Sequence, residues 1–528
     1  MISLTINDKK ISVPEGTTVL QAAEQLGIEI PTLCYLQGYP AHTSCMICVV
    51  KDLTSGKLIP SCSSRADDGM AIQTQDEEIL SFRKSTLDLL LSEHVGDCRA
   101  PCQRICPALM DIPAMIRAIQ QGDWPLAIRI VKEDIPLPAV LGRICSAPCE
   151  NGCTRKQHDE PVSICLLKRA VADIDLTSAK PFRPECAPSS GKHIVVIGAG
   201  PGGLSAAYYL AQYGHQVILC DDHEKPGGAL RYAVPEDKLD RSVLDAEIER
   251  IVDLGITLEM NTRLGEQISL ASLQKEFDAI VIMTGDFQEE LSNDEIETTK
   301  RGIKVDRRTF MTNINGVFAG GNVVSSSKMA VRAVGHGKTI AMAADQYVRE
   351  KPVVGRISRF NSILGRLYDG ESREYLKEAS SIEREEPSHL SKGFSADEAI
   401  KESERCFRCD CRKQNSCKLR LYSDIYDAAQ SRYRIGKRGP FERHVQHDLV
   451  VFEPGKCIKC GICIQITERA GEQFGFTFIR RGFNVKISIP FDEALKRGLE
   501  KVAEECAAAC PTAAISLKSH ESQFAKER

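Results

Sequence analysis

Hydrophobic and polar positions follow different periods in different parts of the chain. Residues 2–13 alternate apolar and polar positions on both sides of Asn7 and Asp8, which predicts a β-hairpin with a tight turn. Residues 17–27 follow with the pattern of a short helix, and residues 113–133 have the helical period as well. These patterns predict a small domain of strands and one helix, followed by a helical domain.

A different pattern begins after a linker rich in proline and serine at residues 181–192. An apolar strand spans residues 194–197, a helix follows from Leu204, and a second strand ends at Asp221. A strand, a helix and a second strand in this order predict an α/β domain with a parallel sheet. The fold class expected for the whole chain is therefore multidomain, with α+β and α/β parts.

Composition narrows the range of functions. The chain of 528 residues is long enough for three or four domains, and its net charge of −4 gives no basic excess for binding nucleic acid or an anionic membrane. No apolar run of about 18 residues predicts a membrane span, and no signal peptide is recognised, so a cytoplasmic protein is expected. In that compartment, 22 cysteines indicate metal or redox chemistry rather than disulfides.

The first group of cysteines follows the predicted hairpin and helix. It consists of Cys34, Cys45, Cys48 and Cys62. Four thiolates suit a [2Fe–2S] cluster, and a four-thiolate zinc site is the alternative. The spacing C-x10-C-x2-C-x13-C resembles the N-terminal ferredoxin domain of the large iron–sulfur subunit of complex I and of iron-only hydrogenases. That resemblance implies a β-grasp domain that holds one [2Fe–2S] cluster.

The second group contains eight candidate ligands, enough for two [4Fe–4S] clusters. They are His94, Cys98, Cys102, Cys106, Cys145, Cys149, Cys153 and Cys165. The Cys-Pro pair and the later GR-x-C-x3-C-x3-C resemble the small subunit of glutamate synthase and the N-terminal domain of dihydropyrimidine dehydrogenase. By that resemblance Cys98, Cys102 and Cys153 hold one cluster, and Cys106, Cys145 and Cys149 hold the other.

The fourth ligand of each of these clusters departs from the family pattern. His94 stands before Cys98 as a ligating histidine does in the complex I subunit, and it is expected to complete the first cluster. Cys165 is expected to complete the second. A solvated surface histidine and an unligated cysteine remain the alternatives.

A glycine-rich turn connects the strand at residues 194–197 to its helix. Gly198, Gly200 and Gly203 form G-x-G-x-x-G, and Asp221 ends the next strand. The glycines let a pyrophosphate approach the helix N-terminus, and the acid can accept hydrogen bonds from an adenosine ribose. The fingerprint predicts a dinucleotide but does not separate FAD from NAD.

Residues 225–256, 316–322 and 330–348 resemble the flavin-contacting segments of the glutamate synthase small subunit. The resemblance implies bound FAD and adds Gly228, Arg231, Gly321 and Asn322 to the cofactor site, with Asn322 where that family has Asp. The family inserts an NADPH-binding domain between its two flavin segments. A βαβ unit needs about 30 residues, yet the interval from Thr284 to Gly316 has no second glycine-rich turn, so this domain is expected to be missing.

Two further cysteine groups follow a charge-rich linker. Cys406, Cys409, Cys411 and Cys417 are spaced C-x2-C-x-C-x5-C, which suits zinc or a further [4Fe–4S] cluster. Cys457, Cys460 and Cys463 have ferredoxin spacing and are expected to share one [4Fe–4S] cluster with Cys510, zinc being the alternative. This last segment resembles the iron–sulfur region of complex I and hydrogenase subunits. Thr467 replaces the next expected cysteine, and Cys186, Cys220 and Cys506 are left over.

The sequence patterns predict six parts along the chain. They are a [2Fe–2S] domain (1–78), a helical domain with two [4Fe–4S] clusters (79–180), an FAD domain (191–350), a linker (351–400), a four-cysteine site (401–425) and a ferredoxin-like domain (440–520). The cofactors expected are FAD, one [2Fe–2S] cluster and about three [4Fe–4S] clusters. No catalytic triad, paired carboxylates or substrate-metal motif is found, so no catalytic residue is assigned.

So many redox groups predict an electron-transfer subunit of a soluble, multi-subunit NAD(P)H- or ferredoxin-linked oxidoreductase. Electron-bifurcating transhydrogenases, hydrogenases and formate dehydrogenases are the types expected. The predicted partners are a flavoprotein resembling the NADH-oxidising subunit of complex I, ferredoxin, and a hydrogenase or formate dehydrogenase subunit. A free-standing NAD(P)H:acceptor flavoenzyme and a redox sensor or scaffold are the alternatives.

Overall fold

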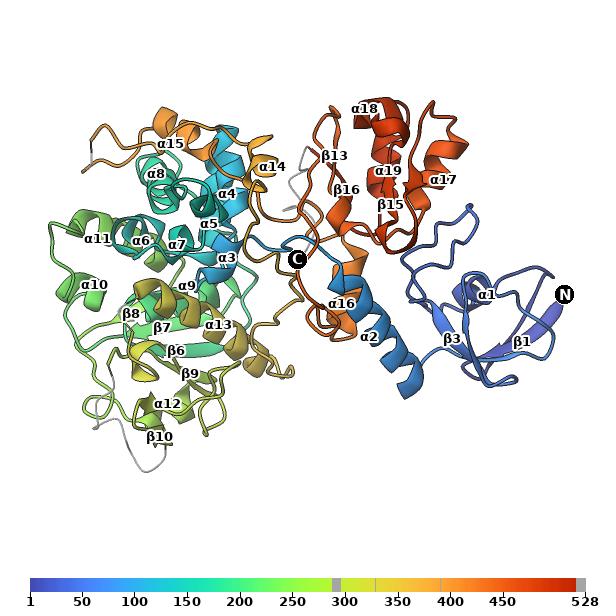
Figure 1. The fold of residues 1–528 in the computed structure, drawn as a ribbon. Helices are drawn as coiled ribbons and strands as arrows, with labels where there is room; N and C mark the ends of the chain where they lie inside the picture. The colour runs from blue at the N-terminus through green and yellow to red at the C-terminus, as the bar shows by residue number, and fades with distance from the viewer. Residues whose placement is uncertain (287–295, 328, 390, 519–528) are drawn as a thin grey trace. The chain divides into compact units, whose positions relative to one another are not determined.

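The computed structural model describes residues 1–286, 296–327, 329–389 and 391–518 (Figure 1). The chain divides into two compact units. Unit 1 comprises Met1–Ala100, Arg359–Glu378 and Cys409–Arg528, and unit 2 comprises Pro101–Ser358 and Ala379–Arg408. The two segments of unit 2 thus alternate in sequence with the three segments of unit 1. No helix in the described ranges is both long and apolar enough to cross a membrane.

Unit 1 begins with a mixed sheet in the order β2-β1-β5-β3-β4. Its strands are β1 (Ile2–Ile6), β2 (Lys9–Val13), β3 (Val49–Asp52), β4 (Lys57–Pro60) and β5 (Ala71–Gln73). The predicted hairpin is confirmed, because β1 and β2 pair antiparallel and both turn residues, Asn7 and Asp8, have positive φ. The predicted helix is α1 (Val19–Gln25), which Thr18 caps together with the side chain of Gln21.

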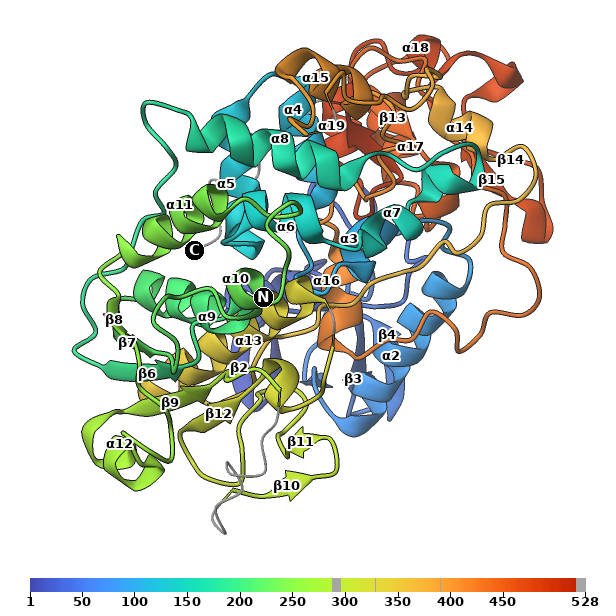
Figure 2. The same cartoon turned by 90° about the vertical axis from the view of Figure 1, so that its left-hand side faces the viewer.

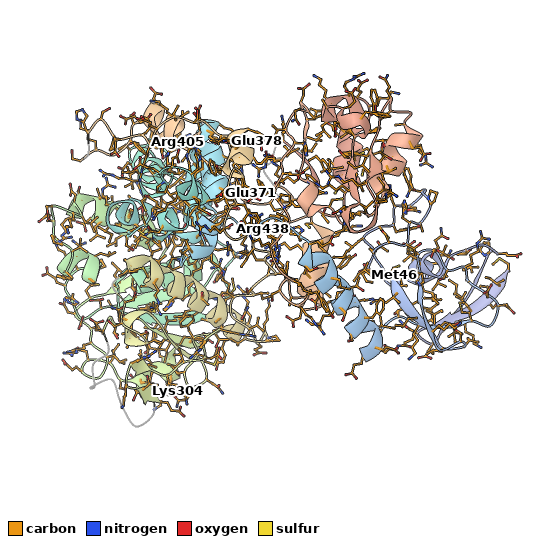
Figure 3. All side chains as sticks on the ribbon, viewed as in Figure 1. Met46, Lys304, Glu371, Glu378, Arg405 and Arg438 are labelled. Atoms are coloured by element: carbon orange, nitrogen blue, oxygen red, sulfur yellow. The ribbon has the colours of Figure 1, made fainter. Side chains whose placement is uncertain are left out.

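The remainder of unit 1 combines helices with short antiparallel strands. Its main elements are α2 (Glu77–Ser92), α14 (Ser372–Leu376), α16 (Lys418–Ile425), β13 (Val450–Phe452), α17 (Ile462–Arg469), β14 (Thr477–Ile479), β15 (Lys486–Ser488), α18 (Leu495–Gly498), α19 (Ala503–Ala509) and β16 (Ile515–Leu517). β13 pairs with β16 and β14 with β15. Glu371 and Arg438, both labelled in Figure 3, form a buried ion pair that joins the segment 359–378 to the C-terminal part.

The first part of unit 2 is helical. It contains α3 (Pro101–Ile105), α4 (Ile112–Gln120), α5 (Trp124–Asp134), α6 (Pro138–Ile144), α7 (Pro148–Asn151) and α8 (Ile164–Leu176), and α15 (Ala396–Ser403) packs against α4 and α8. The helical period predicted for residues 113–133 is resolved into α4 and α5. Asp111 and Asp123 cap these two helices, because each side chain accepts a hydrogen bond from a backbone N–H in the first turn.

The second part of unit 2 is a parallel sheet in the order β12-β9-β6-β7-β8. Its strands are β6 (His193–Ile197), β7 (Gln216–Cys220), β8 (Thr257–Glu259), β9 (Ala279–Ile282) and β12 (Val317–Ala319). The helices are α9 (Pro201–Gln212), α10 (Ala229–Tyr232), α11 (Arg241–Val252), α12 (Leu270–Glu276) and α13 (Ala330–Val348). Figures 1 and 2 show α9 and α13 on one face of this sheet and α12 on the other. Ile194 and Val196 pack into the core with α9, whereas Val195 and Ile197 pack into the core with α12. Burial on both faces explains the continuous apolar strand in the sequence.

A small hairpin lies between β9 and β12. It consists of β10 (Thr298–Thr299) and β11 (Gly302–Ile303). Lys304, labelled in Figure 3, forms an ion pair of 2.6 Å with Glu297 beside it. The polar segment predicted to replace the NADPH domain extends over residues 287–295, which lie outside the described residues.

A buried carboxylate joins the helical and α/β parts of unit 2. Both oxygens of Glu247 on α11 accept hydrogen bonds from the first N–H groups of α6, Ala139 and Val140, each at 2.8 Å. The carboxylate satisfies two helix N–H groups that have no partner within α6. Burial nevertheless raises the pKa of Glu247 to about 7, against the opposing effect of these two bonds.

Because the pKa of Glu247 is raised, the stability of the contact between α6 and α11 is predicted to depend on pH. The folded state holds the proton more tightly than the unfolded state, so the stabilisation is complete below about pH 4.5 and is lost as the pH rises through about 7. The free energy of opening at α6 is expected to fall by up to about 3 kcal/mol between pH 5 and 8. Amide hydrogen exchange of residues 138–144, corrected for intrinsic rates, measures this fall. Glu247→Gln should abolish the pH dependence, while Glu249→Gln, on the exposed side of α11, should keep it; an unchanged dependence in Glu247→Gln would contradict the assignment.

Candidate functional site

The four cysteines of the first group come together in unit 1. Cys34 makes thiol hydrogen bonds with Cys45 and Cys62, and these hold its pKa well below the usual value. Cys48 bonds to Cys62 in the same way, which lowers its pKa to about 7. All four side chains are buried, with exposures of 3% or less. Met46, labelled in Figure 3, has a φ of +53° that lets the loop turn between Cys45 and Cys48.

The last cysteine group also forms one set in unit 1. Cys457, Cys460, Cys463 and Cys510 line one small cavity with apolar neighbours such as Phe452, Ile487 and Pro511. Burial raises the pKa of Cys457 to about 12. Cys506 does not line this cavity, and its thiol donates to the backbone oxygen of Cys463 at 4.0 Å. Thr467 is likewise occupied, because its hydroxyl donates to Ile464 O at 3.0 Å.

A third set surrounds a lysine in unit 2. Lys168 on α8 is buried, which disfavours its charged form, but its pKa is raised by four thiol groups around it. These belong to Cys165, Cys145, Cys149 and Cys106. Cys165 is hydrogen-bonded to both Cys145 and Cys149. The structure therefore places Cys165 with the three cysteines that the sequence grouped together.

Cys102, Cys153 and Cys406 pack against the same hydrophobic core of unit 2. Arg155 connects the segment that contains Cys153 to the segment that contains Cys406. Its guanidinium donates to Arg405 O at 2.6 Å and lies 5.3 Å from the ring of Phe407. Cys406 was predicted to share a site with Cys409, Cys411 and Cys417. The boundary between the units lies between Arg408 and Cys409, so Cys406 is assigned to unit 2 and the other three cysteines to unit 1. The shared site stays a prediction.

Cys98 lies in unit 1 beside Cys411 and Cys417. The backbone N–H of Cys411 donates to the oxygen of Cys98 at 3.1 Å. Burial raises the pKa of Cys411 to about 11 and that of Cys417 to about 12, and the charge of Cys98 adds to both shifts. The resemblance grouped Cys98 with Cys102 and Cys153, which belong to unit 2, and that grouping stays a prediction. Residues 99–408 lie between Cys98 and Cys409, so no local spacing could reveal the contact.

The α/β part of unit 2 contains a cavity of about 1230 Å³. Its lining includes most of the predicted cofactor residues: Gly198, Gly200, Asp221, Gly228, Gly321 and Asn322. Gly198 has a φ of +104°, and a Cβ there would lie 2.4 Å from Met283 O. A Cβ on Gly203 would lie 1.7 Å from Gly198 O, whereas one on Gly200 would have free space. Gly198 therefore permits the tight turn, Gly203 permits the close packing of α9 against the preceding turn, and Gly200 leaves room for a ligand in the cavity.

The polar groups of the cavity fit a dinucleotide. Asp221 is oriented by the N–H of Ala199, which donates to its carboxylate at 2.6 Å, at the end of β7 where a ribose is expected. The hydroxyl of Thr284 also belongs to a lining residue, and it is buried without a hydrogen-bond partner. Asn322 bonds to Asp286 at 2.9 Å and accepts from Ser327 N at 3.0 Å, which fixes its amide.

One predicted residue does not reach this cavity. The side chain of Arg231 bonds to Pro226 O at 2.7 Å and pairs with Asp245, and Arg231 is absent from the lining. Arg143, Cys145 and Ser146 also line the cavity, although no sequence pattern predicted them there. Their position is set by the packing of α6 against α8 and α11, for which the local sequence carries no signal.

Three family models match parts of the chain. Residues 1–77 match a 2Fe-2S iron-sulfur cluster binding domain, residues 92–180 match domain II of dihydropyrimidine dehydrogenase with a 4Fe-4S cluster, and residues 196–255 match an NAD(P)-binding Rossmann-like domain. These matches agree with the [2Fe–2S], [4Fe–4S] and dinucleotide-binding parts predicted from the sequence.

Curated relatives match about one third of the chain. The beta subunit of the NADP(+)-dependent formate dehydrogenase of Moorella thermoacetica is 40% identical over 207 residues, 35% of this chain and 29% of that protein. The beta subunit of the NADPH-Fe(3+) oxidoreductase of Geobacter sulfurreducens is 37% identical over 190 residues, 35% of this chain and 28% of that protein. The PreT subunit of the NAD-dependent dihydropyrimidine dehydrogenase of Salmonella typhimurium is 36% identical over 188 residues, 35% of this chain and 45% of that protein.

The matched region spans less than half the length of each of these relatives. All three are named as subunits of oxidoreductases. From the family models, the chain carries an N-terminal 2Fe–2S domain, a 4Fe–4S domain of the dihydropyrimidine dehydrogenase type and a Rossmann-like dinucleotide-binding domain.

Proposed function

We propose that the chain is an iron–sulfur flavoprotein that transfers electrons as one subunit of a larger NAD(P)H- or ferredoxin-linked oxidoreductase. The observation that carries this proposal is the position of Cys145, which belongs both to a cysteine set and to the lining of the dinucleotide cavity. It lies among the four cysteines around Lys168, and it lines the dinucleotide cavity. A cluster on those cysteines and a dinucleotide in that cavity are therefore immediate neighbours.

FAD is the dinucleotide that this cavity fits best. Its lining extends from the glycine turn to the N-terminus of α13, through Ala330 and Ala333, so it can contain both ends of a long cofactor. The close packing of α13 on α9 requires Gly337, because a Cβ there would lie 2.3 Å from Gly202 O. When bound, FAD supplies the exchange between one- and two-electron chemistry. The chain's own groups Asp221, Asn322 and Thr284 would hold and orient it.

The nicotinamide is proposed to bind to a partner subunit. In the described residues between β9 and β12, which are 283–286 and 296–316, the only paired strands are those of the β10–β11 hairpin. The whole interval is too short for a second domain of alternating strands and helices. A flavoprotein resembling the NADH-oxidising subunit of complex I would supply that site, and ferredoxin would be the other redox partner.

Iron–sulfur clusters are preferred to zinc for the cysteine sets. Residues 1–77 match a 2Fe-2S iron-sulfur cluster binding domain, and residues 92–180 match a domain with a 4Fe-4S cluster. These matches cover the first cysteine set and the set around Lys168, and a [4Fe–4S] cluster is proposed for the last set because of its ferredoxin spacing.

The cysteine sets of unit 1 are arranged in series. The charge of Cys34, from the first set, contributes to the raised pKa of Cys460 in the last set. The charge of Cys510, from that last set, contributes in turn to the raised pKa of Cys417. A [2Fe–2S] cluster on the first set and a [4Fe–4S] cluster on the last set would thus be neighbours, as an electron-transfer chain needs.

The proposal is tested by anaerobic purification from the native host and identification of the bound subunits. We expect a flavoprotein that binds NAD(H) or NADP(H) to co-purify. The isolated chain should contain FAD and iron but should not reduce a viologen dye with NADH or NADPH, and adding the partner should restore turnover. Rapid NADPH oxidation by the chain alone would instead show a free-standing flavoenzyme. A flavin that no partner reduces would favour a sensor or scaffold.

A further inference from the structure

A buried histidine in unit 1 has a ring nitrogen without a hydrogen-bond partner. His94 follows the C-terminus of α2, its exposure is 9%, and its Nδ1 makes no hydrogen bond in the structure. Buried polar atoms are almost always bonded, so this nitrogen requires an explanation. A neutral imidazole with an unpartnered ring nitrogen can bind a metal ion.

The backbone after His94 is held firmly in place. Val95 N donates to Gly455 O at 2.8 Å, and Cys98 N donates to Ser362 O at 3.3 Å. Gly96 has a φ of +158°, and a Cβ there would lie 2.7 Å from the side chain of Lys456. His94 and Cys98 are therefore fixed in position by both later segments of unit 1.

A further backbone contact brings two cysteines that are distant in sequence close to Cys98. Cys411 N donates to Cys98 O at 3.1 Å, and Cys417 follows where the chain enters α16. The sulfur of Cys98 lies 3.2 Å from Ser362 Oγ and 3.4 Å from Ser362 N. Hydrogen bonds of this kind stabilise thiolates that bind metal clusters. Lys456 is close enough to influence both His94 and Cys411.

We propose that His94, Cys98, Cys411 and Cys417 hold one [4Fe–4S] cluster. In the sequence, His94 and Cys98 precede unit 2, and Cys411 and Cys417 follow it. It replaces the compact site predicted from Cys406, Cys409, Cys411 and Cys417. The proposal depends on the fold of unit 1 and not on the proposed function, because it concerns metal content and not turnover.

The ligand set has a spectroscopic consequence. A neutral imidazole in place of a thiolate makes a cluster one charge less negative, which raises its reduction potential. Replacing His94 by cysteine should therefore keep the cluster and lower its potential. A residue with a purely structural role would not produce this shift.

The test compares single variants of the full chain, purified anaerobically, by iron content and by the EPR spectrum of the reduced protein. Cys98→Ser and Cys417→Ser are each expected to remove the same signal, with a loss of about four iron atoms per chain. His94→Cys should keep the iron, change the shape of that signal and lower its potential. Cys406→Ser, the matched control from the compact spacing, should leave that signal unchanged.

Three results would overturn the proposal. In the first, Cys406→Ser removes the same signal as Cys417→Ser, which supports the compact site. In the second, Cys98→Ser and Cys417→Ser remove different signals, or His94→Cys leaves both signal and potential unchanged. In the third, zinc is bound and is lost from Cys417→Ser without loss of iron. Each result leaves the test of partner subunits unaffected.

Discussion

Gly200→Ala is expected to leave the chain folded and to remove its flavin. Gly200 has a φ of −76°, which alanine adopts readily, and a Cβ there would meet nothing closer than Gly228 Cα at 4.0 Å. The space beside it belongs to the cavity, where the pyrophosphate must approach the N-terminus of α9. A methyl group at this point should reduce bound FAD by at least about tenfold, equivalent to about 1.4 kcal/mol of binding free energy. Absorbance of the flavin released by denaturation, per chain, measures the loss.

Gly203→Ala is the control for the fold. Its Cβ would lie 1.7 Å from Gly198 O, so the turn must open and the α/β part should be lost together with the flavin. Circular dichroism should distinguish the two variants, with Gly200→Ala like the parent protein. If Gly200→Ala retained a full complement of FAD, the pyrophosphate would not bind at this turn.

Cys165→Ser is expected to remove one complete [4Fe–4S] cluster from the chain. Cys165 bonds to Cys145 and Cys149 beside Lys168, and serine has nearly the same shape but binds iron poorly. The loss of one of four thiolates should remove about four iron atoms per chain and one EPR signal. The FAD content should be maintained, because Cys165 does not line the cavity.

Cys186→Ser provides the matched control. Cys186 is exposed, belongs to none of the cysteine sets described above, and should tolerate serine without change in iron or flavin. If Cys165→Ser kept all its iron and signals, Cys165 would be a packed thiol and a different fourth ligand would be needed. The variant thus decides between the two roles that the sequence left open for this residue.

The local parts of the fold could be predicted from the sequence, because their causes are local. The turn at Asn7 and Asp8, the cap at Thr18 and the glycines at 198, 200 and 203 each act within a few residues. The last cysteine set could be predicted for the same reason. Cys457, Cys460 and Cys463 lie on one loop and its helix, and the Cys-Pro pair at Cys510 follows the ferredoxin pattern.

The grouping of the remaining cysteines depends on contacts that no spacing encodes. Cys98 is four residues from Cys102 in sequence, yet the unit boundary lies between them, at Ala100 and Pro101. Cys406 and Cys409 are likewise assigned to different units, because the last crossing between the units lies at Arg408 and Cys409. Arg231, which the resemblance assigned to the flavin, pairs with Asp245 and is not among the lining residues, and no sequence pattern indicated this ion pair.

The interruption of unit 1 by unit 2 has a consequence for biosynthesis. Translation at about 5–20 residues per second separates the emergence of Cys98 from that of Cys417 by roughly 15 to 60 s. During this interval the first hundred residues wait on the ribosome without the partners that bury α2 and His94. Unit 2 is released earlier as a nearly continuous segment and can fold first. The proposed cluster on His94, Cys98, Cys411 and Cys417 can therefore form only after Cys417 has emerged, whereas Cys34, Cys45, Cys48 and Cys62 are all available long before unit 2 is complete.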